Sequence, residues 1–220
     1  MLLSTAFFPP VEYFALLAKD FTLSPGRVIP SVVHLEACEH YQKQSWRNRC
    51  RILAAGGPLD LQVPVVHAGG AGHLPIREIR VDYATPWLPK FERAVRSAYD
   101  MSAFFDYYRD DLFALLEARP GTLFDLNLQV IRFFLEKTGV AADFRFTQDY
   151  LPAGLAEAAC GDDWRERIHP KRANTVLTDL GLKKPYFQVF SSKYGFTEGL
   201  SIMDLVFNEG PDAILYLKNR

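Results

Sequence analysis

Cysteine is scarce in this chain of 220 residues, which contains only Cys38, Cys50 and Cys160 and no CxxC pair. An odd number without paired spacing argues against a disulfide framework and against a zinc knuckle, and it suits a reducing compartment. Long apolar runs are also missing, because no window approaches the roughly 20 residues that a membrane-spanning helix needs. The apolar N-terminus has no basic residue before it and is interrupted by Pro9 and Pro10, which is not typical of a targeting segment. We therefore expect a cytoplasmic protein.

The chain also lacks an excess of either charge, since it has 25 basic and 26 acidic residues. Attraction to nucleic acid or to a membrane surface would need a local basic patch, so we do not expect a general nucleic-acid binder. What the chain has is apolar material, at 49% hydrophobic residues, which is enough to bury a sizeable core. We expect one domain over residues 1–220, and its oligomeric state stays open.

Several catalytic motifs are absent. The glycine-rich residues 67–75 lack the GxGxxG order of a dinucleotide loop, and no GxSxG marks a hydrolase nucleophile. No HExxH or Cys/His pairing supports a metal, because His34, Glu36 and His40 would meet only if the chain turned between them. We expect no metal site and no cofactor.

The N-terminal pattern predicts a βαβ unit. Residues 2–8 are an apolar run, residues 11–20 carry apolar side chains at helical spacing after two prolines, and residues 28–37 are rich in β-branched side chains. A strand–helix–strand order makes the two strands a parallel pair.

A hairpin is predicted next. Residues 46–53 and 59–65 flank a GGP turn, and the second segment alternates strictly, with Pro64 favouring a sheet edge. Residues 76–83 have the alternation of a further strand.

Three helices are predicted over residues 86–98, 102–118 and 122–138. The third has the strongest signals, because Thr122 and Asp125 resemble a capping box and Gly139 stands where a left-handed cap belongs.

The C-terminal third is more irregular. Residues 143–150 and 185–190 are predicted as strands, the polar residues 151–184 as a long loop, residues 201–210 as a capped helix, and residues 213–217 as a strand that closes the sheet. We therefore predict an α/β fold: a mixed sheet with an N-terminal βαβ unit, a hairpin and a helical segment packed on it.

One candidate site lies at residues 39–51. Strand geometry would put Arg47, Arg49 and Arg51 on one face, where guanidinium groups could clamp a carboxylate or phosphate. The alternative is a solvated strand face that pairs with neighbouring acids. A second candidate is residues 161–172, where His169 among basic residues could transfer a proton near neutral pH. The alternative there is an exposed loop of mixed charge.

Residues 41–65 carry a family resemblance, through the segments YQKQSWRNRCRI and GGPLDLQVPV. They resemble the WbqC-like proteins, which have a similar lysine, an aromatic-Arg-Asn-Arg segment, a glycine turn and an L-x-V-P-V strand. The similarity continues in order through PPVEYF, DYATPW, AYDMSAFFDYY, RIHPK, PYFQVF and GLSIMDLVFNEGP. The resemblance implies a role in O-antigen or other surface-polysaccharide biosynthesis, as a glycine or other aminoacyl transferase that modifies a sugar.

Matched position by position, the resemblance implies substrate-binding residues. They are Tyr13, Lys43, Trp46, Arg47, Asn48 and Arg49.

Two positions depart from the family pattern. Many members have a histidine where this chain has Leu3, and some have one where it has Phe91. If those histidines transfer protons, either His169 or Glu39 replaces them here or the protein has only a binding role.

Three hypotheses stay open. In the first, Arg47 and Arg49 hold the phosphate of an activated donor, so the ligand is an anionic small molecule or a nucleotide sugar. In the second, the protein is a non-catalytic module for an anionic metabolite or a pathway partner. In the third, the arginines form a structural ion-pair network.

Overall fold

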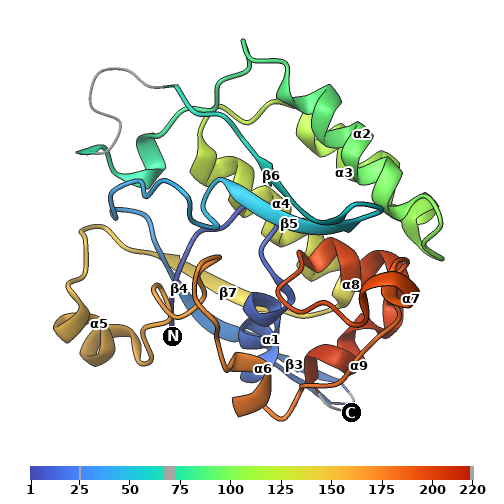
Figure 1. Cartoon of the computed structure of the whole chain (residues 1–220). Helices are drawn as coiled ribbons and strands as arrows, with labels where there is room; N and C mark the ends of the chain where they lie inside the picture. Colours follow the sequence, from blue (N-terminus) through green and yellow to red (C-terminus); the bar gives the residue numbers. More distant parts are fainter. Residues whose placement is uncertain (25, 67–72, 219–220) are drawn as a thin grey trace.

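A parallel sheet of three strands lies in the lower half of the molecule as drawn in Figure 1. The computed structural model describes residues 1–24, 26–66 and 73–218. In the sheet, β1 (Leu2–Ser4) pairs with β4 (Ser31–Glu36), and β4 pairs with β7 (Ala142–Phe146). Helix α1 (Val11–Lys19) follows β1, so the predicted parallel βαβ unit is confirmed.

Two antiparallel hairpins accompany this sheet. The first, β2 (Thr22–Ser24) with β3 (Arg27–Ile29), interrupts the βαβ crossover and was not predicted. The second, β5 (Arg49–Ala54) with β6 (Gly57–Gln62), is the predicted hairpin, and Pro64 lies beyond its paired residues.

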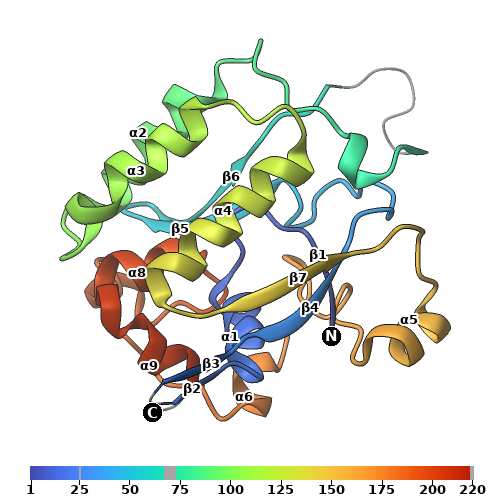
Figure 2. The same cartoon turned by 180° about the vertical axis from the view of Figure 1, so that it is seen from behind.

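Three successive helices match the prediction: α2 (Trp87–Tyr99), α3 (Phe105–Glu117) and α4 (Leu123–Thr138). In both views, α2 and α3 lie beyond the β5–β6 hairpin, on the side away from the parallel sheet (Figures 1 and 2). The N-terminus of α4 is capped as expected, because the Thr122 hydroxyl accepts from the Asp125 backbone N–H at 3.1 Å.

The remaining short elements follow the chain from its middle to its C-terminal end. They are the 3-10 turn η2 (Ile76–Glu78), helices α5 (Ala153–Cys160), α6 (Val176–Asp179), α7 (Ser191–Tyr194) and α8 (Ile202–Glu209), the 3-10 turn η3 (Gly210–Asp212) and helix α9 (Ala213–Lys218).

Three strand predictions in these regions were wrong. Residues 76–83 begin with η2, after which the buried Ile79 follows, and residues 80 and 81 form only isolated bridges, with Thr122 and Val65. Residues 213–217 form α9, because the buried pair Ala213 and Leu217 stand four residues apart, a spacing that a helix places on one face.

The third wrong strand, residues 185–190, pairs with no strand in the described part of the chain. Its side chains still alternate: Tyr186 and Gln188 are buried, whereas Phe187 is 60% exposed. Buried and exposed side chains therefore do alternate in this segment, but the buried ones point toward α8 rather than into a sheet face.

Aromatic rings fill the centre of the core. Phe8 contacts both Phe91 of α2 and Phe134 of α4, with ring centroids 5.1 Å and 5.9 Å away. Phe14 of α1 and Phe207 of α8 also pack against Phe134. One hydrophobic cluster thus joins the N-terminal unit, the middle helices and the C-terminal helices.

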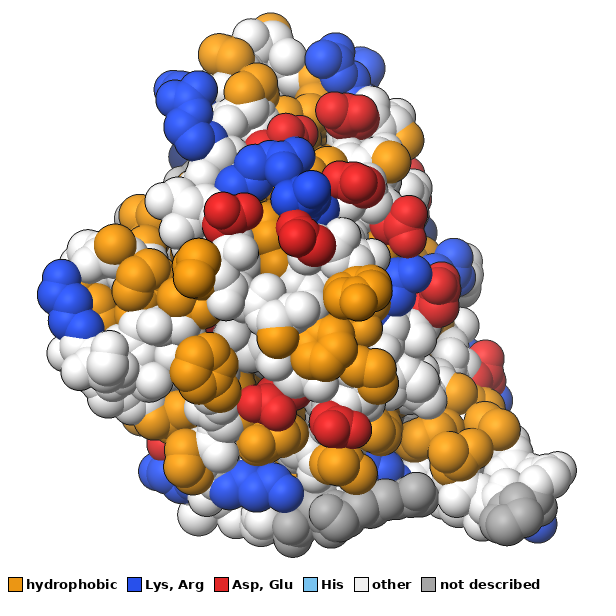
Figure 3. Space-filling view, turned by 90° about the vertical axis from the view of Figure 1, so that its right-hand side faces the viewer, with side chains coloured by type: hydrophobic (Ala, Val, Ile, Leu, Met, Phe, Trp, Pro, Cys, Tyr) orange, Lys and Arg blue, Asp and Glu red, His pale blue; other side chains and the backbone are white. Residues whose placement is uncertain are grey.

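The surface has mixed charge. On the face drawn in Figure 3, lysines and arginines lie beside aspartates and glutamates, as a chain of near-zero net charge would suggest. Within the described ranges, no helix is long and apolar enough to cross a membrane. The glycine-rich residues 67–72 lie outside the described residues, and the rest of the predicted loop, residues 73–75, leads into η2.

Candidate functional site

The carboxyl edge of the parallel sheet gathers polar residues from distant parts of the chain. Strands β1, β4 and β7 run in the same direction and end at this edge. The segment 162–164 runs alongside β1 in parallel, because the Leu2 N–H donates to the Asp162 carbonyl and the Trp164 N–H donates to the Leu2 carbonyl, both at 2.9 Å. In α/β proteins, ligands bind beyond the carboxyl ends of such strands.

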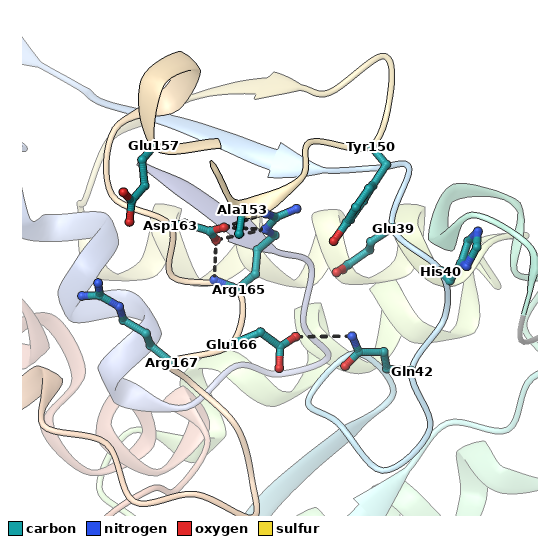
Figure 4. Close-up of a pocket in the computed structure, with 10 residues that line it drawn as sticks. All are labelled: Glu39, His40, Gln42, Tyr150, Ala153, Glu157, Asp163, Arg165, Glu166 and Arg167. Carbon is teal, nitrogen blue, oxygen red and sulfur yellow. Dashed lines mark hydrogen bonds and ion pairs between the residues drawn. The ribbon is translucent and has the colours of Figure 1, made fainter. Parts of the chain in front are cut away.

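A cavity of about 640 Å³ opens at this edge. Figure 4 shows that its lining comes from the segment after β4, the segment after β7, helix α5 and the segment after the extra parallel bridge. The lining residues are Glu39, His40, Gln42, Tyr150, Ala153, Glu157, Asp163, Arg165, Glu166 and Arg167. The volume lies within the range of ordinary small-molecule sites.

A buried ion pair closes one side of the cavity. The Arg47 Nε donates to Glu39 Oε1 at 2.8 Å, and its Nη2 donates to Glu39 Oε2. The Ser4 hydroxyl accepts from Arg47 Nη2 at 2.8 Å and donates to Glu39 Oε2 at 3.0 Å. Burial raises the pKa of the Glu39 carboxyl, and the Arg47 charge opposes the rise.

A second arginine bridges two acids in the opposite wall. Arg165 donates from Nη1 to Glu36 at 2.9 Å and from Nη2 to Asp163 at 2.6 Å. Burial tends to raise the pKa of Asp163, but hydrogen bonds and charge from Arg165 outweigh it and hold that pKa below its usual value. The Tyr150 ring lies 5.3 Å from the Arg165 guanidinium carbon, so Arg165 is held on several sides.

Two charges in the lining have no ionic partner in the described part of the chain. The Arg167 guanidinium lies 4.7 Å from the Trp164 ring and pairs with no carboxylate there, while Glu157 of α5 pairs with no cation. By contrast, Glu166 pairs with Arg172 at 3.6 Å. Arg167 is therefore a cavity guanidinium without a salt-bridge partner among the described residues, although its positive charge helps to lower the pKa of Asp163.

The structure does not form the predicted face of three arginines. Arg47 precedes β5 and turns toward Glu39, whereas Arg49 and Arg51 lie in the strand and both reach Asp60 of β6, at 3.5 Å and 2.7 Å. The strand therefore begins at Arg49, three residues later than the predicted start at residue 46. The three guanidinium groups are neutralised in two separate places.

The other substrate-binding residues implied by the resemblance mostly form hydrogen bonds or pack within the protein. The Tyr13 hydroxyl donates to the Ser4 carbonyl at 3.0 Å, and the Asn48 side chain donates to the Val63 carbonyl at 2.9 Å. Trp46 is buried, and Lys43 is exposed in the turn before it. Tyr13, Trp46 and Arg47 together line a small cavity of about 20 Å³ beside the large one.

His169 lies in a different cavity from Glu39. It lines a space of about 200 Å³ together with Glu12, Trp46 and Arg51. Its Nδ1 accepts from the Lys171 backbone N–H at 3.2 Å, so the neutral ring carries its proton on Nε2. Burial, followed by the positive charge of nearby arginines, lowers the pKa of His169. Glu39 and His169, the two predicted catalytic residues, therefore line different cavities.

A family model for the WbqC-like proteins matches residues 5–168. The chain belongs to the WbqC-like protein family. An uncharacterized protein of Mycobacterium tuberculosis, Rv1507c, is 27% identical over 199 residues, and the match covers 81% of this chain and 84% of that protein. No solved structure matches significantly.

The part of the chain matched by the WbqC-like model contains the charged residues of both ion-pair networks of the large cavity, whereas Ser4 lies just before it. It ends one residue before His169, so the smaller cavity combines matched and unmatched residues. The positions where the resemblance places histidines hold buried apolar side chains, with Leu3 1% and Phe91 3% exposed.

Sequence reasoning missed most of the residues around the large cavity. Glu36, Tyr150, Arg165 and Arg167 were not selected as site residues, although Arg165 and Arg167 stand in the polar segment that supplied His169. The available signal was the predicted βαβ unit, because residues just after parallel strands converge at one edge.

Proposed function

We propose that this protein is a cytoplasmic, single-domain transferase that modifies a sugar in bacterial surface-polysaccharide biosynthesis, by glycyl or other aminoacyl transfer. Membership of the WbqC-like family supports a role in surface-polysaccharide biosynthesis, because the family resemblance implies that role. The observation that carries the site is Arg167, which forms no salt bridge with a described residue and lies in a cavity of about 640 Å³ whose other arginine is neutralised.

The large cavity suits a ligand that is anionic at one end and hydroxylated elsewhere. A guanidinium binds phosphate through two parallel hydrogen bonds, and Arg167 lines the cavity with its guanidinium carbon 4.7 Å from the Trp164 ring. Tyr150, Gln42 and Glu166 add a hydroxyl, an amide and a carboxylate, which match sugar hydroxyls as donors and acceptors. The clamp is thus assigned to Arg167 in place of Arg47 and Arg49.

The transfer would join the acceptor to an acyl group that an activated phosphate ester or anhydride supplies. A hydroxyl or amine of the acceptor forms a bond to the acyl carbon, and the bond from that carbon to the phosphate oxygen breaks. Glu39, whose pKa burial raises, is the candidate to take the acceptor proton. Arg167 stabilises the negative charge that the leaving phosphate acquires.

Calorimetric titration with UDP-N-acetylglucosamine and with inorganic pyrophosphate tests this site. Arg167→Ala should weaken the binding of both ligands about tenfold or more, because a charge-assisted hydrogen bond is lost. The matched control is Arg93→Ala, which removes an exposed arginine of α2 outside the cavity. Equal affinities for the wild type and Arg167→Ala would remove the basis of the proposal.

A non-catalytic binding module is the second candidate. The apolar residues Leu3 and Phe91, buried where the resemblance places histidines, favour it. Incubation with a nucleotide sugar and an activated glycine, followed by mass spectrometry, separates the two functions. A glycylated sugar supports the transferase, whereas binding without any product supports the module.

A further inference from the structure

Glu157 differs from the other carboxylates that line the large cavity. The others are paired with arginines: Glu39 with Arg47, Asp163 with Arg165, and Glu166 with Arg172. Glu157 is exposed and forms no salt bridge with a described residue. A carboxylate that the protein leaves unpaired in a cavity can accept charge-assisted hydrogen bonds from a cationic group of a ligand.

Helix α5 directs Glu157 into the cavity. Ala153 and Glu157 stand four residues apart, which places them on one face of the helix, and both line the cavity. Ala156 is fully buried and holds the neighbouring face of α5 against the rest of the protein. The packing of α5 thus sets where this carboxylate lies.

Arg167 supplies the opposite charge near Glu157. Figure 4 shows both side chains on the same side of the cavity, and they form no salt bridge with each other. A ligand that is only anionic would be repelled by Glu157, and a ligand that is only cationic would be repelled by Arg167. A ligand group that carries both charges satisfies both side chains. This side of the cavity therefore favours a zwitterionic group.

We infer that Glu157 and Arg167 select a ligand in which a two-carbon unit joins an ammonium group to a phosphate ester. Arg167 holds the phosphate, and Glu157 accepts hydrogen bonds from the ammonium group. The inference rests on the proposed transfer, because a glycyl or other aminoacyl phosphate has this arrangement, with the α-carbon and the acyl carbon between nitrogen and ester oxygen. Glu157 then distinguishes an aminoacyl donor from an acyl donor that lacks the amino group.

The opposite side of the cavity suits the remainder of such a donor. In Figure 4, Tyr150 and Gln42 stand across the cavity from Glu157 and Arg167. Their hydroxyl and amide groups can hydrogen-bond the hydroxyls of a sugar or a ribose. The volume of about 640 Å³ has room for such a group beside the zwitterionic end.

Phosphoethanolamine and ethyl phosphate test the inference as a matched pair, because they differ in the ammonium group alone. Titration of the isotope-labelled protein, followed through the Trp164 indole and the backbone amides of α5, gives the two affinities. Phosphoethanolamine should bind about fivefold or more tightly than ethyl phosphate, and Glu157→Gln should remove this preference without weakening ethyl phosphate. Glu117→Gln, at an exposed carboxylate of α3 outside the cavity, should keep the preference.

The acyl part of the donor is tested by competition with glycylsulfamoyl adenosine, a stable analogue of an aminoacyl phosphate ester, and with its acetyl counterpart. The glycyl compound should displace phosphoethanolamine about fivefold or more effectively than the acetyl compound does. If neither compound displaces phosphoethanolamine, the zwitterion belongs to a phosphoethanolamine headgroup, and the assignment to an aminoacyl donor is overturned.

Equal affinities for phosphoethanolamine and ethyl phosphate, or a preference that Glu157→Gln retains, would overturn the role of Glu157. Failure of both probes to bind the wild type would do the same. In each case, binding of pyrophosphate that depends on Arg167 would leave the proposed function standing, so the two proposals fail separately.

Discussion

Arg47 binds Glu39 at two points, with its Nε 2.8 Å from Oε1 and its Nη2 on Oε2, and both side chains are almost fully buried. Such a pair contributes little net stability compared with apolar residues, but the removal of one partner leaves a buried charge without compensation. Ser4 and Gln42 hydrogen-bond the same guanidinium, so its loss would leave several groups unsatisfied.

Arg47→Ala should therefore lower the free energy of unfolding by about 3–5 kcal/mol. Equilibrium denaturation in urea measures this loss. Arg93→Ala, at an exposed position of α2, is the control and should change stability by less than about 0.5 kcal/mol. In the double variant with Glu39→Gln, part of the loss should be recovered because no buried charge remains. A wild-type midpoint for Arg47→Ala would contradict this account.

Asp204 predicts a pH dependence of stability. It is buried in α8, where the Tyr186 hydroxyl and the Gln188 amide each donate to its Oδ2 at 2.9 Å. Burial raises the pKa of Asp204 to about 7, from 3.8 for the unperturbed group. Between these values the folded protein keeps a proton that the unfolded chain has lost, so unfolding becomes easier as the pH rises from about 4 to 7.

Asp204→Asn should remove this contribution, because the amide is neutral and still accepts from Tyr186 and Gln188. Relative to the wild type, the variant should gain stability by up to a few kcal/mol between about pH 4 and pH 7, with no further gain above it. Urea denaturation at a series of pH values gives the two profiles. Parallel profiles across this range would show that Asp204 does not titrate there.

Local signals explain which parts of the fold were predictable. The limits of α4 follow from Thr122, Asp125 and Gly139, all within a few residues of the helix ends they define. The β1–β4 pairing also follows from the order of elements along the chain, because strand–helix–strand units are parallel. Helix α9 was missed because a short apolar run fits a buried strand and a helix equally well.

The site was less predictable because its contacts join distant segments. Arg47 lies in a segment that the sequence indicates as a candidate site. Its contacts with Ser4 and Glu39, however, depend on how β1 and β4 pair. The wall formed by Arg165 and Glu36 joins residues separated by 129 positions. A count of charges along the chain cannot tell a neutralised arginine from a free one, and this distinction separates Arg47 from Arg167.

Gly210 supplies the last prediction, at the junction of α8 and η3. Its φ is +56°, a conformation that favours glycine, and a Cβ built on it would lie 2.5 Å from Cδ1 of the Phe104 ring. Gly210→Ala should therefore lower the free energy of unfolding by about 1–3 kcal/mol, through backbone strain and displacement of Phe104. Gly154→Ala in α5, where an added Cβ meets nothing within 4 Å, should keep or slightly raise the stability. Thermal melts of the two variants make the comparison, and equal melting temperatures would mean that Phe104 moves aside without cost.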